Sequence, residues 1–561
     1  MPDAASARYD EIEREIERMH SSNQKTKEEG IESLHKISKE IGRSNTIQYM
    51  VPFIKTILDT AEEAKRPVLR QIDRIVRELV KEITPLLPVY KEIFLTRSEE
   101  IRKHAAETCI ATVEYLEQEQ KRENEGEMEK IRNFAVLLSE SRFIMHRLSS
   151  LALIGELVRK RGKEKTIEQA YRSLLRDKSP VVRRKAVLVN DALDAFFDEE
   201  QLRNMVEAVL EDAEDSVRSE FASPLHLFLK RKEDPIFLMK IFKASAQDQS
   251  WQVRKASSKI IKEVAERVPA VPSTDAADAL LLIERLIEDK EKLVRKSATE
   301  EIPEVFAKVP KSKQHLLVIV ERASRDRSPK VRQSVPEVLS KISETMTKEE
   351  LETHVLPIVR KLLVDEDRST KMETVSRIRV LYTKLGSEAV TEALTPVVTD
   401  LSSPNWRTRL AVLKSIASFG IQIEQEYFKA HLKDQFFKMF TDPVWSVRKE
   451  AANILSEISE KFGDAWILEE SLPSLRYLKE STHYMHRISY VTAVSELLKK
   501  NHIEEVNTQL EEDLLHLSKD SVAQVRLSVG KAVASSSMKI KNEIIKDLMN
   551  DANKEVSKSC M

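Results

Sequence analysis

The stretch DPVWSVRKEA, residues 442–451, contains a short pattern that returns along the chain. An aspartate stands six residues before an arginine, and a valine stands directly before that arginine. The same frame is present in DKSPVVRRKA from Asp177, DQSWQVRKAS from Asp248, DRSPKVRQSV from Asp326 and DSVAQVRLSV from Asp520. Composition alone does not produce such a frame so often, and the sequence therefore contains internal repeats.

The repeats have a period near 39 residues in the C-terminal part of the chain, where the frame's arginines are evenly spaced. The basic residue recurs at Lys27, Arg70, Arg102, Arg147, Arg183, Arg218, Arg254, Arg295, Arg332, Lys371, Arg409, Arg448, Arg487 and Arg526, with Ser557 in the equivalent place at the end. A period of roughly 40 residues is typical of two-helix units that stack into a solenoid. We therefore predict an all-α fold, a right-handed α-solenoid of about fifteen repeats in a curved arc.

Each repeat has the sequence signature of two helices joined by a short turn. The first helix carries apolar residues at helical spacing, as in HLLVIVERASRD, residues 315–326. The turn is often Ser-Pro, and these residues suit the N-cap and the first position of the second helix. Such pairs are Ser179-Pro180, Ser328-Pro329 and Ser403-Pro404. The valine of the frame is expected to point inward and to begin an apolar stripe.

The acid of the frame is expected to lie at the junction between repeats. It is Asp177, Asp212, Asp248, Asp289, Asp326, Asp365, Asp442 or Asp520, and Thr96, Ser141, Ser403 and Ser481 replace it elsewhere. Such an acid can pair with an arginine of its own repeat or of an adjacent one, and a pair within one repeat would join Asp442 to Arg448. A ladder of these pairs would fix the register of stacking.

Composition limits the classes of function. Lys and Arg total 92 against 93 Asp and Glu, a balance that argues against a general nucleic-acid binder. Cys109 and Cys560 match no metal-ligand spacing, which favours a reduced, cytoplasmic or also nuclear protein. No apolar run approaches the roughly 18–20 residues that span a membrane. The polar run at residues 117–130 is expected to be a solvated loop or a helix extension.

The sequence contains no recognisable catalytic motif. With only 9 glycines it has no G-x-G-x-x-G and no phosphate-binding loop, and G-x-S-x-G and H-E-x-x-H are also missing. His483 and His486 could share a helix face, but no third metal ligand accompanies them. We expect no enzymatic activity, no cofactor and no metal.

Large aromatic residues stand at the turns of several repeats. Trp251, Trp445 and Tyr484 each precede the frame's arginine by three residues, as Trp406 precedes Arg409. A ring at this position can lie over the neighbouring turn, or it can contact a partner protein, where Trp, Tyr and Arg dominate binding. Three such rings in consecutive repeats favour the partner.

Four stretches resemble the HEAT-repeat scaffold (A) subunits of serine/threonine protein phosphatase 2A. They are NWRTRLAVLKSIASFG (405–420), DPVWSVRKEAANILSEISEKFGDAW (442–466), YMHRISYVTAVSEL (484–497) and DSVAQVRLSVGKAV (520–533). The resemblance implies a non-catalytic scaffold that binds a phosphatase catalytic subunit and an exchangeable B-type regulatory subunit. It assigns the catalytic subunit to Trp406, Arg407, Trp445, Tyr484 and Val525. It assigns the regulatory subunit to Pro180, Arg183, Arg184 and Trp251.

The resemblance also implies a division of one continuous array. Residues 1–345, roughly repeats 1 to 9, would bind the regulatory subunit, and residues 346–561, roughly repeats 10 to 15, the catalytic subunit. Two alternatives remain open. A HEAT-repeat nuclear-transport receptor has a similar architecture but is normally longer and more acidic. A tubulin-binding adaptor also presents tryptophan and basic residues at its turns, usually in units of about six repeats.

Overall fold

The computed structural model describes residues 4–21, 23–60, 62–79, 83–119, 125–267, 273–308, 313–377, 384–385, 399–420, 425–500, 503–534 and 541–558. Every regular element in these ranges is helical, as predicted. The chain packs as two compact units, Met1–Leu282 and Ile283–Met561.

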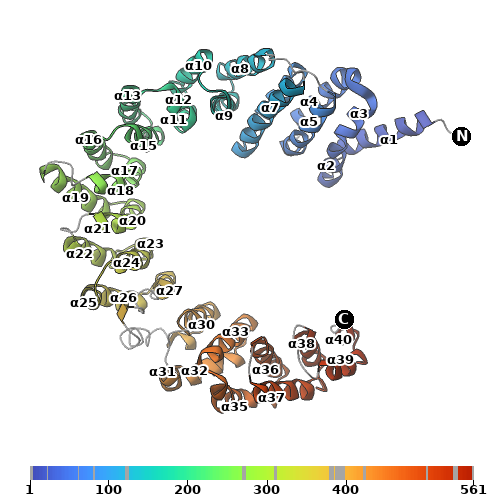
Figure 1. Ribbon diagram of the computed structural model, residues 1–561, viewed down its shortest axis with the longest axis vertical. Coiled ribbons are helices and arrows are strands. Elements are labelled where there is room, and N and C mark those ends of the chain that lie inside the picture. Colours follow the sequence, from blue (N-terminus) through green and yellow to red (C-terminus); the bar gives the residue numbers. More distant parts are fainter. Residues whose placement is uncertain are drawn as a thin grey trace. The chain divides into compact units, whose positions relative to one another are not determined.

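The helices follow one another along the chain as labelled in Figure 1. The earlier ones are α1 (Ala4–Met19), α2 (Gln24–Glu32), α3 (Leu34–Asn45), α4 (Val51–Thr60), α5 (Lys65–Leu79), α6 (Leu87–Ile93), α7 (Glu99–Glu119), α8 (Glu125–Ser139), α9 (Ile144–Arg161), α10 (Lys165–Leu175), α11 (Pro180–Val187), α12 (Asn190–Phe196), α13 (Glu199–Leu210), α14 (Asp215–Arg218), α15 (Ala222–Arg231), α16 (Pro235–Ala246), α17 (Trp251–Ser258) and α18 (Ile261–Arg267). The later ones are α19 (Ser273–Ile287), α20 (Lys292–Glu300), α21 (Ile302–Lys308), α22 (Lys313–Ala323), α23 (Pro329–Arg332), α24 (Val335–Ser343), α25 (Lys348–Glu350), α26 (Leu356–Leu363), α27 (Arg368–Arg377), α30 (Trp406–Gly420), α31 (Gln425–Tyr427), α32 (Lys433–Lys438), α33 (Trp445–Phe462), α34 (Asp464–Trp466), α35 (Leu472–Lys479), α36 (Tyr484–Leu497), α37 (Glu504–Leu517), α38 (Ala523–Ala534), α39 (Lys541–Met549) and α40 (Lys554–Lys558).

Second helices of successive repeats pack against one another within each unit. In the first unit α7 packs on α9, α9 on α11, α11 on α14 and α14 on α17. In the second unit α30, α33, α36 and α38 form a continuous row, which Figure 1 shows as neighbouring helices. Because each second helix contacts the next, the repeats stack as a solenoid.

Helix α33 shows why the frame makes a second helix. Val447, Ala451, Ile454 and Ile458 recur at helical spacing and are buried, so one stripe of the helix faces the core. The helix ends at Gly463, whose φ of 86° lies in the left-handed region. Glycine adopts this conformation without a steric penalty, and its N–H donates to the carbonyl of Ser459.

The Ser-Pro turns agree with the prediction in two of three cases. Pro180 begins α11 and Pro329 begins α23, each preceded by a serine at the N-cap. The serine hydroxyls make no capping bond there; instead the backbone N–H of each serine donates to the frame's aspartate at 2.7 Å. Ser403-Pro404 was placed wrongly, because α30 begins at Trp406 and the Asn405 side chain accepts the N–H of Arg407. Between α7 and α8, residues 120–124 lie outside the described residues.

The predicted ladder exists, and it joins adjacent repeats. Arg409 donates from Nε and Nη2 to the two carboxylate oxygens of Asp442 at 2.5 and 2.9 Å, and from Nη1 to the carbonyl of Ser403 at 2.7 Å. The same rung joins Arg147 to Asp177, Arg183 to Asp212, Arg218 to Asp248, Arg295 to Asp326, Arg332 to Asp365, Arg487 to Asp520 and Arg526 to Asp551. Each arginine thus holds its own turn through a carbonyl and the next repeat through a carboxylate.

The pairing of Asp442 with Arg448 within one repeat was wrong. Arg448 donates to the backbone carbonyl of Asp442 and not to its carboxylate, because the carboxylate already accepts the hydrogen bonds of Arg409. Asp551 was missed as a ladder acid, since Ser557 follows it where the other repeats have the arginine.

Candidate protein-binding surfaces

The predicted aromatic residues of the second unit lie at equivalent positions of neighbouring helices. Trp406, Trp445 and Tyr484 are the first residues of α30, α33 and α36, which pack side by side. Trp445 is 44% exposed and Tyr484 is 41% exposed. We call Trp406, Arg407, Trp445 and Tyr484 the aromatic edge.

Arg407 and Trp406 form a pair at one end of the aromatic edge. The guanidinium carbon of Arg407 lies 4.6 Å from the centre of the Trp406 ring, a cation–π geometry. Arg407 is exposed, whereas Trp406 is only partly buried. The pair therefore presents a planar cation and an aromatic ring together to solvent, the side-chain types that dominate protein interfaces.

Trp445 and Tyr484 border one hollow. It has a volume of about 470 Å³ and lies along α33, α36 and α38. Its other lining residues are Arg448, Met485, Ile488, Val491, Thr492, Ser495, Gln524, Ser528, Lys531 and Ala532. Trp406 and Arg407 do not line this hollow, so the aromatic edge consists of two parts.

Val525 does not belong to this surface. Its side chain is 0% exposed, because it is the valine of the frame and points into the core between repeats. Its assignment as a contact residue is therefore corrected: the side chain packs inside the solenoid and cannot meet a partner. Trp466, the fourth tryptophan, is also buried, against Phe428 and Phe462.

The predicted regulatory-subunit residues divide between two places in the first unit. Pro180, Arg183 and Arg184 lie on α11, whereas Trp251 begins α17 and is partly exposed. Arg183 is bound to Asp212 at 2.8 Å through both Nε and Nη2, so its guanidinium is a ladder group and not a free donor. Arg184 is exposed and pairs with Glu220.

Arg184 also borders a larger hollow of about 610 Å³. Val181, which is 55% exposed, and Leu188 supply apolar surface there. The charged residues around it include both signs: Glu99 pairs with Lys185, and Glu156 pairs with Arg159. This mixture suits a polar protein partner with interspersed charges better than a single anion.

Serine replaces the frame's acid at Ser141 and Ser481, but sequence reasoning did not infer that each leaves a buried arginine of the preceding repeat without a ladder carboxylate. Ser481 stands where Arg448 would find its acid, and Ser141 stands in the same relation to Arg102. Each arginine instead lies against a methionine sulfur, at 3.7 Å for Arg448 and Met485 and 3.8 Å for Arg102 and Met145. Each serine hydroxyl contacts a histidine, His486 or His146.

The signal for these interruptions was present in the sequence. ESRFIMHRLS (140–149) and ESTHYMHRIS (480–489) are nearly the same motif, with serine in place of the frame's acid. In both places burial lowers the pKa of the preceding arginine, Arg102 or Arg448, below its ordinary value. In five intact rungs the arginine pKa is raised, chiefly by the hydrogen bond to aspartate; these arginines are Arg183, Arg218, Arg295, Arg332 and Arg526.

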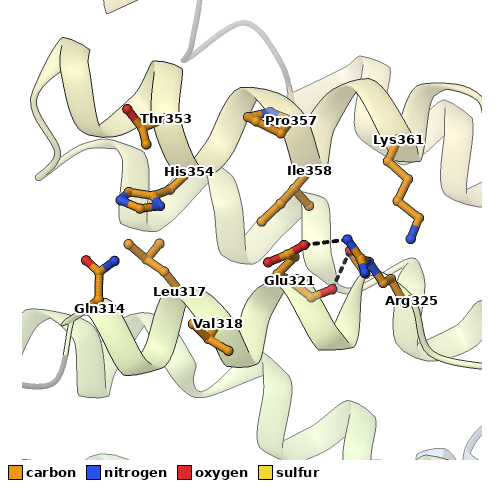
Figure 2. A pocket seen from close by; sticks show the side chains of 11 residues that line it. Gln314, Leu317, Val318, Glu321, Arg325, Thr353, His354, Pro357, Ile358 and Lys361 are labelled. Carbon is orange, nitrogen blue, oxygen red and sulfur yellow. Dashed lines mark hydrogen bonds and ion pairs between the residues drawn. The ribbon is translucent and has the colours of Figure 1, made fainter.

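A smaller cavity lies elsewhere in the second unit. Figure 2 shows a cavity between α22 and the segment Leu351–Leu363, bordered by Leu317, Ile358, Lys361 and the ion pair of Arg325 with Glu321. Its volume of about 190 Å³ is below the roughly 300–1,000 Å³ of ligand clefts. Among the described residues no group of three or more His, Cys, Asp or Glu side chains could hold a metal ion. Within the same ranges no helix is both long and apolar enough to cross a membrane.

Comparison with protein families gives a direct match inside the second unit. The HEAT repeat model matches residues 432–462, which end with α33. The fold is a HEAT-repeat solenoid. No curated protein sequence matches the chain.

Solved structures with the same fold are karyopherins at low identity. Kap95p in a structure with RanGDP has a TM-score of 0.62 and 13% identity, covering 99% of this chain and 76% of that one. Kap121p bound to Pho4p has a TM-score of 0.58 and 16% identity, covering 85% of this chain and 52% of that one. A Kap95:Nup1 complex gives 0.58 and 12%, covering 99% and 76%. The chain spans about half the length of the Kap121p chains. At this low identity, the likeness to these structures shows a shared fold alone.

Proposed function

We propose that this HEAT-repeat chain is a non-catalytic scaffold that assembles a serine/threonine protein phosphatase 2A holoenzyme. The aromatic edge carries the proposal, because it presents rings and a cation to solvent in consecutive repeats where the resemblance to the phosphatase scaffold is strongest. The catalytic subunit would bind there, within residues 346–561. The regulatory subunit would bind within residues 1–345, through Pro180, Arg184 and Trp251.

The mechanism of such a scaffold is architectural. Two proteins held on one frame meet at a high effective concentration, and their placement determines which substrates reach the catalytic centre. The scaffold itself supplies shape and binding energy, whereas the metals and reacting groups belong to the partner. This division fits a surface that offers aromatic and cationic side chains at its turns.

A nuclear-transport receptor is the second candidate, and the karyopherin structures favour it. The TM-score of 0.62 to Kap95p extends over 99% of this chain. A transport receptor binds a Ran-type GTPase and cargo, so it would use the same kind of solenoid for different partners. The low identity of 12–17% shared with these neighbours leaves partner choice to experiment.

One pair of titrations separates the candidates. The purified chain is titrated with a recombinant phosphatase 2A catalytic subunit and, separately, with a GTP-loaded Ran-type GTPase. We expect binding of the catalytic subunit and none of the GTPase, and no hydrolysis of a phosphopeptide by the chain alone. If the chain binds the GTPase and does not bind the catalytic subunit, the result would contradict the phosphatase scaffold and support the transport receptor.

A further inference from the structure

An intact rung of the ladder shows what its arginine is built to bind. Arg487 donates from Nη1 to the carbonyl of Ser481 at 2.6 Å, which fixes the plane of the guanidinium. Its Nε and Nη2 then point together at Asp520, at 2.6 and 2.9 Å. Two parallel N–H groups in this arrangement match the two oxygens of a carboxylate.

Arg448 retains this fork but lacks the carboxylate. Its Nη1 donates to the carbonyl of Asp442 at 2.5 Å, as in an intact rung. Its Nε has no hydrogen-bond partner among the described residues, and its Nη2 donates to the Met485 sulfur at 3.7 Å. The guanidinium carbon also lies 5.4 Å from the centre of the Trp445 ring. The two donors that bind a carboxylate elsewhere therefore meet none here, because the acid's position is Ser481.

The surroundings of Arg448 make the lack of a carboxylate partner energetically unfavourable. The residue is 6% exposed, and burial lowers its pKa, which the nearby Asp442 only partly offsets. Lys531 also lines the hollow, and no acidic residue is among the described residues that border it. A buried cation without a counterion is unfavourable, so an incoming carboxylate would gain a charge-assisted, two-pronged bond.

Arg102 provides the comparison inside the same chain. It has the same serine, methionine and histidine neighbours, and it also borders a hollow. That hollow, however, is lined by Glu99, Glu156 and Asp191. Glu99 offsets the effect of burial only in part, so the pKa of Arg102 stays below its ordinary value. Carboxylates of the chain itself therefore border the hollow beside Arg102, whereas the described residues supply none to the hollow beside Arg448.

We propose that Arg448 is a receptor for an aspartate or glutamate side chain of a partner protein. The partner's carboxylate completes the rung that Ser481 leaves open, and apolar residues beside it enter the hollow between Trp445 and Tyr484. The carboxylate displaces the thioether of Met485, a flexible side chain that is 45% exposed. The inference deepens the proposed function, since it names what the catalytic-subunit site recognises.

The first test needs no partner protein. Methionine methyl groups of the full chain are labelled with ¹³C, and the Met485 signal is assigned with Met485→Leu. The capped peptide acetyl-Leu-Asp-Leu-amide is titrated, with acetyl-Leu-Asn-Leu-amide as the matched neutral probe. We expect a saturable shift of the Met485 methyl signal with the acidic peptide, at least about fivefold weaker with the neutral one. No shift, or equal shifts with both peptides, would overturn the proposal.

The second test fills the site from within. Ser481→Asp restores the ladder acid in its own chain, and Ser481→Asn is the neutral control of equal size. We expect Ser481→Asp to melt at a higher temperature than Ser481→Asn and to abolish the peptide-induced shift of Met485. We also expect it to bind the catalytic subunit at least about tenfold more weakly than wild type, with Ser481→Asn within about threefold.

The two tests separate the two ideas. If the wild-type chain does not bind the catalytic subunit, the proposed function fails, and the peptide titration still decides the carboxylate site. If the catalytic subunit binds both Ser481 variants equally, the carboxylate site is refuted while the scaffold function stands.

Discussion

Single residues at the turns either stabilise the packing of repeats or form the exposed binding surface, and the side chains that they contact distinguish the two roles. The guanidinium of Arg487 is held on three sides, and its side chain and that of Asp520 are 12% and 8% exposed. Arg407 is the second residue of α30 and stands two residues before the frame's Arg409. Its side chain is exposed, and among the described residues its guanidinium contacts the ring of Trp406. Substitution of Arg487 should therefore lower stability, whereas substitution of Arg407 should weaken the binding of a partner.

For the ladder, we expect Arg487→Ala to lower the free energy of unfolding by about 1–3 kcal/mol, because Asp520 is left partly buried without its partner. Arg407→Ala is the matched control and should change it by less than about 0.5 kcal/mol. Urea denaturation followed by circular dichroism measures both. Equal midpoints for the two variants would show that the rung contributes no net stability.

For the surface, the double variant Trp406→Ala, Arg407→Ala should keep the wild-type melting temperature. Its affinity for the phosphatase catalytic subunit should fall by about 2–4 kcal/mol if both residues are hot spots, or at least about tenfold. Calorimetric titration and a thermal melt on the same sample provide the two numbers. A variant that binds normally, or that melts early, would remove these residues from the binding surface.

At the scale of elements, the sequence determined helices and their order, since the frame marks the start of each second helix. It predicted that the frame's valine points inward, and the buried Val525 agrees with that prediction. The contact role of Val525 came from the resemblance to the phosphatase scaffold, which assigned a partner contact to this core position. Pairing between repeats could not be derived, because sequence separation favours Arg448, six residues from Asp442, over Arg409, which is 33 residues away. The serine at position 481 was visible in the sequence, but that it leaves Arg448 without a carboxylate follows only from the pairing between repeats.

Helix ends give a prediction at this scale. Gly463 ends α33 at a φ of 86°, with open space where a Cβ would lie. Gly463→Ala should cost about 1 kcal/mol through backbone strain alone. Gly126, in the first turn of α8, also has open space but no positive φ, so Gly126→Ala should be neutral or slightly stabilising. Denaturation midpoints that move in the same direction for both would contradict this account.

At the scale of the whole molecule, the ladder joins neighbouring repeats at many junctions through groups that titrate. Burial raises the pKa of the Asp212, Asp326 and Asp520 carboxyls, but hydrogen bonds from arginine and from the backbone lower it more, so each net pKa lies below the ordinary value. For Asp551 the hydrogen bond from Arg526 is the largest cause of the same shift. These four rungs therefore weaken in the same direction as the pH falls.

The sign of this response follows from linkage. A carboxyl whose folded pKa is depressed stabilises the fold above its unfolded pKa of about 3.9, and that stability is lost as the pH falls through the folded pKa. We expect the melting temperature to change little between about pH 7 and pH 5 and to fall steeply below about pH 4. Asp520→Asn removes one titrating rung, so its melting temperature should be lower at neutral pH and should converge on wild type in acid. Thermal melts by circular dichroism across this range measure both curves. If the two curves stay parallel at every pH, the ladder carboxylates are not the groups through which acid loosens the stack.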